Sequence, residues 1–155
     1  MRRKALRYAL LSLIVLTLAF IFGQSALPPA TSGAESSAVR DFLGKIFPPS
    51  TSLGAFLYQN TRKIAHFAEY ALLGTEVSWY ACLFMRKNKA FYLKAPLFGL
   101  LSAFADETVQ IFSKRAPSII DVWIDLFGYL SGFALVGVTF FIISKLKQGK
   151  NNGKN

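Results

Sequence analysis

The chain has 155 residues and a formal net charge of +10, and 53% of its residues are hydrophobic. The length allows one domain, and a mean hydropathy of +0.38 is higher than expected for a soluble protein. Its single cysteine, Cys82, excludes an internal disulfide and a metal site built from several cysteines.

Four apolar stretches approach or reach the length that spans a bilayer, roughly 17–25 residues. The fourth is the clearest because residues 126–144 contain no charge, whereas the second and third are interrupted by acidic residues. The sequence therefore predicts an all-α membrane protein. We expect it to fold as a bundle of four transmembrane helices in one domain over residues 1–144, followed by a basic, disordered tail over 145–155. The predicted spans lie at about residues 6–22, 63–85, 95–112 and 121–144.

The basic residues indicate how these spans are oriented. If the N-terminus is cytoplasmic, most of the 18 Lys and Arg residues lie at cytoplasmic boundaries, in residues 2–7, 86–94 and the tail. Such an excess is the positive-inside rule, so we predict that both termini are cytoplasmic. The same distribution argues against nucleic acid as a partner, because no basic stripe lies on a soluble element. The predicted partner is the lipid bilayer.

The first span has two interpretations. Arg2, Arg3 and Lys4 precede it, as basic residues precede the apolar part of a secretory signal peptide. The apolar stretch is long for that role. In addition, residues 23–27 match poorly the pattern of small residues that a signal-peptide cleavage site requires. We therefore expect a retained membrane anchor.

The segment after the first span is expected to lie outside the membrane. Residues 24–37 are rich in Pro, Ser, Thr and Gly and include Pro28 and Pro29, which predicts an irregular loop. Apolar residues recur at helical spacing over 39–47. This predicts a short amphipathic helix that either lies on the outer interface or packs in a protein groove. Ser-Thr-Ser at 50–52 suits the N-cap of a helix that leads into the second span.

Polar residues gather in the outer third of three spans. His66 and Glu69 lie roughly 5 and 9 Å below the outer start of the second span, at about 1.5 Å per residue. Similar depths are reached by two i, i+4 pairs in the third and fourth spans, Asp106 with Gln110 and Asp121 with Asp125. Charged groups in spans normally face the bundle interior or a wet cavity. We therefore predict one polar pocket open to the outside, with Arg62, Lys63 and Arg115 around its mouth.

The fourth span also carries Gly128 and Gly132, one helical turn apart. Small residues at this spacing let a second helix approach closely. They predict a packing surface, either within the bundle or between two copies of the chain in a homo-oligomer.

In these polar blocks the chain resembles the VanZ-like family of small bacterial membrane proteins, named for a teicoplanin-resistance protein. The resemblance covers about residues 60–137. It rests on RKIAHFAEY at 62–70, Asp106, Glu107, Gln110 and Phe112, Arg115, and Asp121, Asp125, Gly128 and Gly132. Two departures are Asp125, where many relatives have Asn, and a connection between Gln110 and Arg115 that is a residue shorter and lacks Pro-Gly. The resemblance implies a multi-pass protein of the bacterial plasma membrane, in the cell envelope. Glycopeptide tolerance belongs to the namesake of the family. The resemblance implies no established biochemical activity for this chain.

Three functions fit the predicted pocket, beside a purely structural role in holding the helices together. We favour the first, which is binding of a lipid-linked cell-wall intermediate or another envelope-derived ligand. The predicted ligand-binding residues are Arg62, Lys63, His66, Glu69, Tyr70, Asp106, Glu107, Gln110, Arg115, Asp121 and Asp125.

The second function is that of a membrane-embedded enzyme in which His66, the only histidine, acts as general acid and base. Glu69 or Asp106 would orient it, and Glu107 completes the catalytic candidates. The third is an ion- or proton-coupled transporter that uses Glu76 as a relay and needs oligomers. No cofactor is expected. One histidine among carboxylates is a weak metal signature, so we expect no resident metal.

Overall fold

The structure is a computed structural model that describes residues 2–152, and within them the side chains of residues 2–28 and 37–148. The described part of the chain is all helical and contains no strand, which confirms the predicted all-α class. Its helices are α1 (Arg2–Ala26), α2 (Pro29–Ile46), α3 (Ser52–Gln59), α4 (Thr61–Phe84), α5 (Lys89–Phe112) and α6 (Ile119–Asn152).

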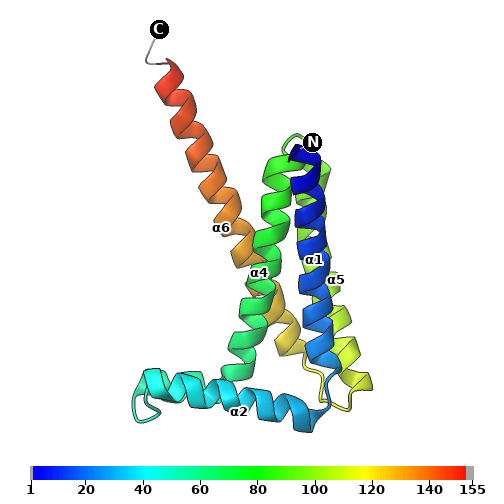
Figure 1. The fold of residues 1–155 in the computed structure, drawn as a ribbon, viewed down its shortest axis with the longest axis vertical. Helices are drawn as coiled ribbons and strands as arrows, with labels where there is room; N and C mark the ends of the chain where they lie inside the picture. The colour runs from blue at the N-terminus through cyan, green and yellow to red at the C-terminus, as the bar shows by residue number, and fades with distance from the viewer. Residues whose placement is uncertain (1, 153–155) are drawn as a thin grey trace.

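The other three long helices, α1, α5 and α6, pack around α4. Helix α6 makes its most extensive contact with α4, and α1 lies against both α4 and α5. Helix α2 lies crosswise at the end of the bundle remote from the N-terminus, and the second half of α6 diverges from the other helices (Figure 1). The end of the bundle next to α2 is therefore the place where α1, α2, α4, α5 and the start of α6 come together.

Two helices are long and apolar enough to cross a membrane, namely α1 over Arg2–Ala26 and α6 over Ile119–Gln148. Helices α4 and α5 are of similar length but carry several charged residues, among them Glu69, Glu76, Asp106 and Glu107. These residues lower the hydropathy of their helices, so the crossing of four helices stays a prediction.

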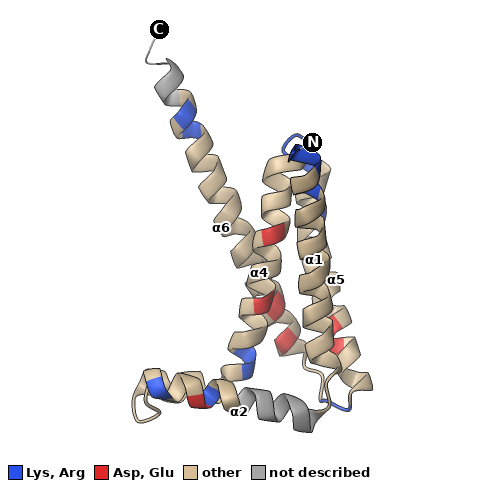
Figure 2. Cartoon of the chain, viewed as in Figure 1, with Lys and Arg blue, Asp and Glu red and all other residues tan. Residues whose placement is uncertain are grey.

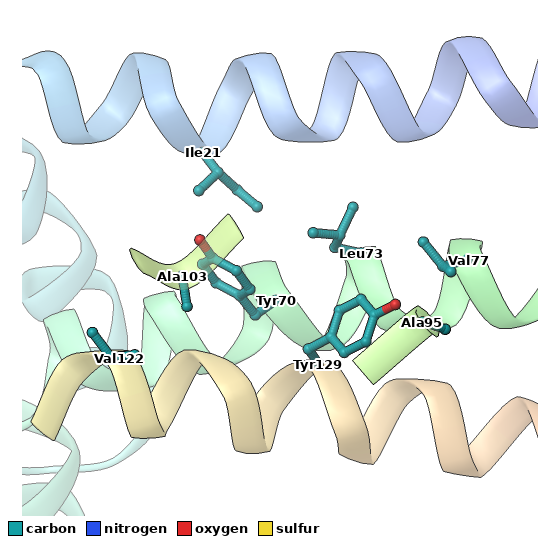
Figure 3. Packing of buried hydrophobic residues seen from close by; sticks show 8 residues of the cluster. All are labelled: Ile21, Tyr70, Leu73, Val77, Ala95, Ala103, Val122 and Tyr129. Carbon is teal, nitrogen blue, oxygen red and sulfur yellow. The ribbon is translucent and has the colours of Figure 1, made fainter. Parts of the chain in front are cut away.

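A small apolar core fills the centre of the bundle. Its buried residues come from all four long helices (Figure 3), and they are Ile21, Tyr70, Leu73, Val77, Ala95, Ala103, Val122 and Tyr129. Because α1 contributes the fully buried Ile21, it is an integral part of the packed bundle. The retained anchor stays a prediction.

Glycines allow α4 and α6 to lie in backbone contact. A Cβ atom at Gly128 would overlap the carbonyl oxygen of Phe67, and one at Gly132 would overlap that of Ala71. Helix α4 contributes Gly74 in return, where a Cβ would overlap the carbonyl oxygen of Tyr129. The Gly128/Gly132 face is thus occupied by α4 within the chain, and a homo-oligomer through this face stays a prediction.

Two segments predicted to be irregular are helical. Helix α1 continues to Ala26 and α2 begins at Pro29. The prediction of an irregular loop over 24–37 is therefore wrong, except for the break at Leu27 and Pro28. Proline at the first position of a helix is favourable because the missing N–H has no helical partner there. The predicted amphipathic helix at 39–47 is the second half of α2.

The predicted tail also differs from the structure. Helix α6 extends through Asn152, well past the predicted end of the fourth span, and residues 153–155 lie outside the described part. The cap predicted before α3 is present, because the hydroxyl of Thr51 accepts a hydrogen bond from the Gly54 amide at 3.0 Å.

A Schellman motif ends α5. Lys114 adopts a left-handed φ of 59°, its amide donates to the Ile111 carbonyl at 3.2 Å, and the Arg115 amide donates to the Gln110 carbonyl at 3.0 Å. These two bonds define the motif, which usually has glycine at the left-handed position. The tight turn brings Arg115 back toward α1, so the short connection noted in the sequence still delivers this arginine to the bundle.

Candidate functional site

A pocket of about 260 Å³ opens at the α2 end of the bundle. Helices α1, α2 and α4 line it together with the connection between α5 and α6. Its lining residues are Phe20, Gln24, Ser25, Val39, Thr61, Arg62, Ala65, His66, Glu69 and Arg115. The pocket therefore combines charged and polar groups with a few apolar side chains.

Two arginines lie in the pocket wall. The Arg62 guanidinium donates to the Gln110 side-chain oxygen. Arg115 donates from Nη1 to the Gln24 carbonyl at the end of α1, at 3.1 Å. Burial, and then the proximity of Arg62, lower the pKa of Arg115, although a guanidinium stays protonated in proteins. No carboxylate in the described part of the chain forms an ion pair with either arginine.

Gln110 connects one of these arginines to the acidic residues below the pocket. Its side chain is fully buried, accepts from Arg62, and donates from Nε2 to Asp106 at 3.2 Å and to Glu107 at 2.9 Å. Glu107 in turn accepts from the Ser118 amide, just before α6, at 2.7 Å. One amide side chain thus joins α4, α5 and the start of α6.

His66 faces two buried carboxylates from different helices. Its Nδ1 lies 3.7 Å from Asp106 Oδ2 on α5 and 3.4 Å from Asp125 Oδ1 on α6. Asp106 and Asp125 are 0% exposed and His66 is 8% exposed. The polar residues of these three helices thus lie close together, as their similar predicted depths led us to expect. The result is a buried cluster of His66, Asp106 and Asp125 next to the pocket, which we name the His-Asp cluster.

Other predicted site residues lie apart from the pocket. Lys63 is exposed and lines a different surface with Phe56 and Ile64. Asp121 is half-buried at the start of α6 and does not line the pocket. Tyr70 is fully buried in the apolar core, and its hydroxyl has no hydrogen-bond partner among the described residues.

Glu76, the candidate relay, lies deeper along α4 and outside the pocket lining. It is 2% exposed, and its Oε1 accepts a hydrogen bond from the Thr17 hydroxyl of α1 at 2.9 Å. This contact satisfies one carboxylate oxygen, whereas the other, Oε2, is buried without a hydrogen-bond partner among the described residues. A relay role for Glu76 stays a prediction.

The contribution of α1 and α2 was not anticipated from the sequence. Gln24 and Ser25 line the pocket at the end of α1, and the Ser25 carbonyl accepts from the Ser113 hydroxyl at 2.7 Å. Val39 of α2 lines the same pocket. A signal was present, because Gln24 and Ser25 directly follow the first apolar stretch, at the outer end where the mouth of the predicted pocket lies.

Charge is distributed unevenly along the bundle. Asp and Glu lie mainly in the half that faces α2, whereas Lys and Arg occur at both ends of the bundle (Figure 2). The basic residues of the half that faces α2 are Arg40, Lys45, Arg62, Lys63, Lys114 and Arg115. The two pocket arginines therefore lie where acidic and basic residues are nearly balanced, yet neither forms an ion pair in the described part of the chain.

A family model described as VanZ/LLP1 matches residues 9–142. No curated protein and no solved structure gives a significant match. The matched range begins in α1 and ends in α6, so it includes every helix that contributes to the pocket and to the His-Asp cluster.

Proposed function

The chain belongs to the VanZ/LLP1 family, and from this premise we propose that it is a multi-pass protein of the bacterial plasma membrane that binds an anionic, envelope-derived lipid in its pocket. The ligand class is a lipid-linked cell-wall intermediate, with a phosphate or diphosphate head group and a long apolar chain. Family membership and the apolar helices α1 and α6 support the membrane location.

The side of the membrane follows from charge. The N-terminus and the α4–α5 connection are basic and lie at the end of the bundle remote from α2 (Figure 2). Basic segments stay in the cytoplasm, which puts both termini inside and the pocket on the outer side. The crosswise α2 then lies along the outer interface, where its exposed Val39, Phe42 and Ile46 would meet lipid.

The observation that carries the proposal is a pair of guanidinium groups in one pocket without a carboxylate partner. Arg62 and Arg115 both line the pocket, and neither forms an ion pair in the described part of the chain. The Nε of Arg62 is buried and has no hydrogen-bond partner there either. Guanidinium groups bind phosphate through paired N–H donors, and Phe20 and Val39 offer apolar contacts to the adjoining lipid chain.

The first prediction concerns binding of a polyprenyl diphosphate to the full chain in nanodiscs, measured by native mass spectrometry. The double variant Arg62→Ala/Arg115→Ala should weaken binding at least about tenfold, because a charge-assisted hydrogen bond contributes roughly 1.5–3 kcal/mol. Lys63→Ala is the matched control, since it removes a neighbouring cation that lies outside the pocket. Equal affinities in the double variant and in the control would refute the proposed site.

We also propose that this binding contributes to tolerance of teicoplanin, a glycopeptide that acts on cell-wall synthesis. In a strain that lacks the protein, the wild-type chain should restore tolerance and the Arg62→Ala/Arg115→Ala chain should not. The minimal inhibitory concentration of teicoplanin measures this, with Lys63→Ala as the control and membrane abundance checked for every variant. Full restoration by the double variant would show that tolerance does not depend on binding in the pocket.

A second candidate function, acid–base catalysis by His66, is favoured by one observation. The imidazole lines the pocket while its Nδ1 faces two buried carboxylates, an arrangement that orients a general base. In the same cells, His66→Gln distinguishes the two functions. Full restoration of tolerance by this variant excludes catalysis, whereas loss of tolerance with unchanged lipid binding favours it.

A further inference from the structure

We propose that the His-Asp cluster is a site for one divalent metal ion, held by His66 Nδ1 and by one carboxylate oxygen each from Asp106 and Asp125. One ligand atom from each of the three residues lies within 4.8 Å of the others. The three residues come from α4, α5 and α6, so the ion would tie three helices together. The proposal does not depend on which ligand the neighbouring pocket binds.

The spacing of the donor atoms suits coordination better than hydrogen bonding. Two ligand atoms that bind a common ion at roughly 2.1 Å lie about 3.4 Å apart in a tetrahedral site. The distances from His66 Nδ1 to the two carboxylates are 3.4 and 3.7 Å. The two spacings that include the imidazole are therefore close to the one that such an ion requires, and small side-chain shifts would bring the whole set, now within 4.8 Å, around one ion.

Four donor atoms of the cluster lack other partners, whereas Asp106 Oδ2, the oxygen 3.7 Å from the imidazole, accepts a hydrogen bond from Gln110. His66 Nδ1, Asp106 Oδ1 and both carboxylate oxygens of Asp125 are buried without a hydrogen-bond partner among the described residues. Asp106 and Asp125 are both 0% exposed. A buried carboxylate without a donor or a positive charge is costly, and Arg62, the nearest cation in the hydrogen-bond network, contacts Gln110 instead.

Protonation of His66 alone does not satisfy the hydrogen bonds and the charge of both carboxylates. An imidazolium has one proton on Nδ1, and that proton can complete a good hydrogen bond to only one of the two carboxylates. It also supplies one positive charge against two negative charges when both acids are ionised. A divalent ion with a neutral imidazole balances the two carboxylates and satisfies all three donor groups at once.

The donor set indicates the class of metal. One imidazole nitrogen with carboxylate oxygens suits Zn²⁺ or Mn²⁺ better than Ca²⁺ or Mg²⁺, which prefer oxygen ligands alone. Three protein ligands leave a coordination position open, as in catalytic zinc sites. This proposal departs from the expectation drawn from the sequence, where the weak motif gave no reason to expect a resident metal.

The test uses the full chain, purified in detergent, stripped with a chelator and then loaded with Zn²⁺ or Mn²⁺ alone. The wild-type chain should bind about one equivalent with a raised thermal midpoint, because a ligand that binds only the native state stabilises it. Asp125→Asn and His66→Gln should each weaken binding at least about tenfold. Glu76→Gln, which alters a buried carboxylate outside the cluster, is the matched control and should bind like the wild type.

Two results overturn the proposal. One is the absence of stoichiometric binding of either metal to the wild-type chain, and the other is equal affinity in wild type, Asp125→Asn and His66→Gln. Asn has nearly the same size and shape as Asp, so we expect the Asp125→Asn chain to fold. X-ray absorption of the Zn²⁺-loaded wild-type chain gives an independent readout. Nitrogen and oxygen neighbours support the site, and a sulfur neighbour, which could come from Cys82, contradicts it.

Discussion

Replacement of Gly132 by alanine is expected to destabilise the protein by about 3 kcal/mol or more, beyond the usual range for an overpacked core. A Cβ atom at this position would overlap the carbonyl oxygen of Ala71, and the Thr75 hydroxyl would lie 2.9 Å away. Neither backbone can move without separating α4 from α6, which is the most extensive helix contact in the chain. Thermal unfolding of the purified chain in detergent, followed by circular dichroism, measures the change.

Gly137 on the same helix is the matched control. A Cβ atom there would lie 3.6 Å from the Ser78 hydroxyl, which is an ordinary contact distance. Gly137→Ala should therefore be neutral or stabilise by up to about 1 kcal/mol, because alanine is the better helix former. If Gly132→Ala and Gly137→Ala unfold at the same temperature, α4 and α6 are not in backbone contact at Gly132.

Replacement of Gln110 by leucine is expected to have the second-largest effect, a loss of about 2–4 kcal/mol in stability together with loss of binding in the pocket. Leucine has a similar size but neither donates nor accepts hydrogen bonds. The change would leave Arg62, Asp106 and Glu107 without the partner that joins them. Unfolding in detergent measures the first effect, and polyprenyl diphosphate binding in nanodiscs measures the second.

Thr108 serves as the control for this prediction because it lies on the same helix, two residues earlier. Its side chain is exposed, and its hydroxyl donates only to the Phe104 carbonyl within α5. Thr108→Val removes a polar group without breaking a contact between helices and should leave both readouts unchanged. A Gln110→Leu chain as stable as Thr108→Val would show that Gln110 does not hold the helices together.

Much of the site could be predicted from residue depth and helical phase. His66, Asp106 and Asp125 lie on three different spans at similar depth, and the structure brings them within 4.8 Å of one another. Depth and phase do not specify which face of a helix meets which neighbour. That is why Lys63, one residue from Arg62, could not be excluded from the pocket although it lies on another surface.

The contributions of α1 and α2 show the limit of the same reasoning. Proline and serine near the end of the first span predict a loop, yet Pro29 begins an 18-residue helix. Gln24 and Ser25 belong to the pocket because α1 ends against the α5–α6 connection, held by Arg115 and Ser113. That contact joins residues about ninety positions apart, and no local pattern records it.

The sequence by itself determined the all-α class, the approximate positions of the four long helices and the set of polar residues predicted to share one depth along the bundle. It could do so because hydropathy and helical periodicity are local properties of the chain. Only the tertiary structure decided that Gly128 and Gly132 pack on α4 within one chain, that two arginines share a pocket without carboxylate partners, and that His66 faces Asp106 and Asp125. These features depend on the rotation and close approach of helices, which follow from side-chain packing across the whole bundle.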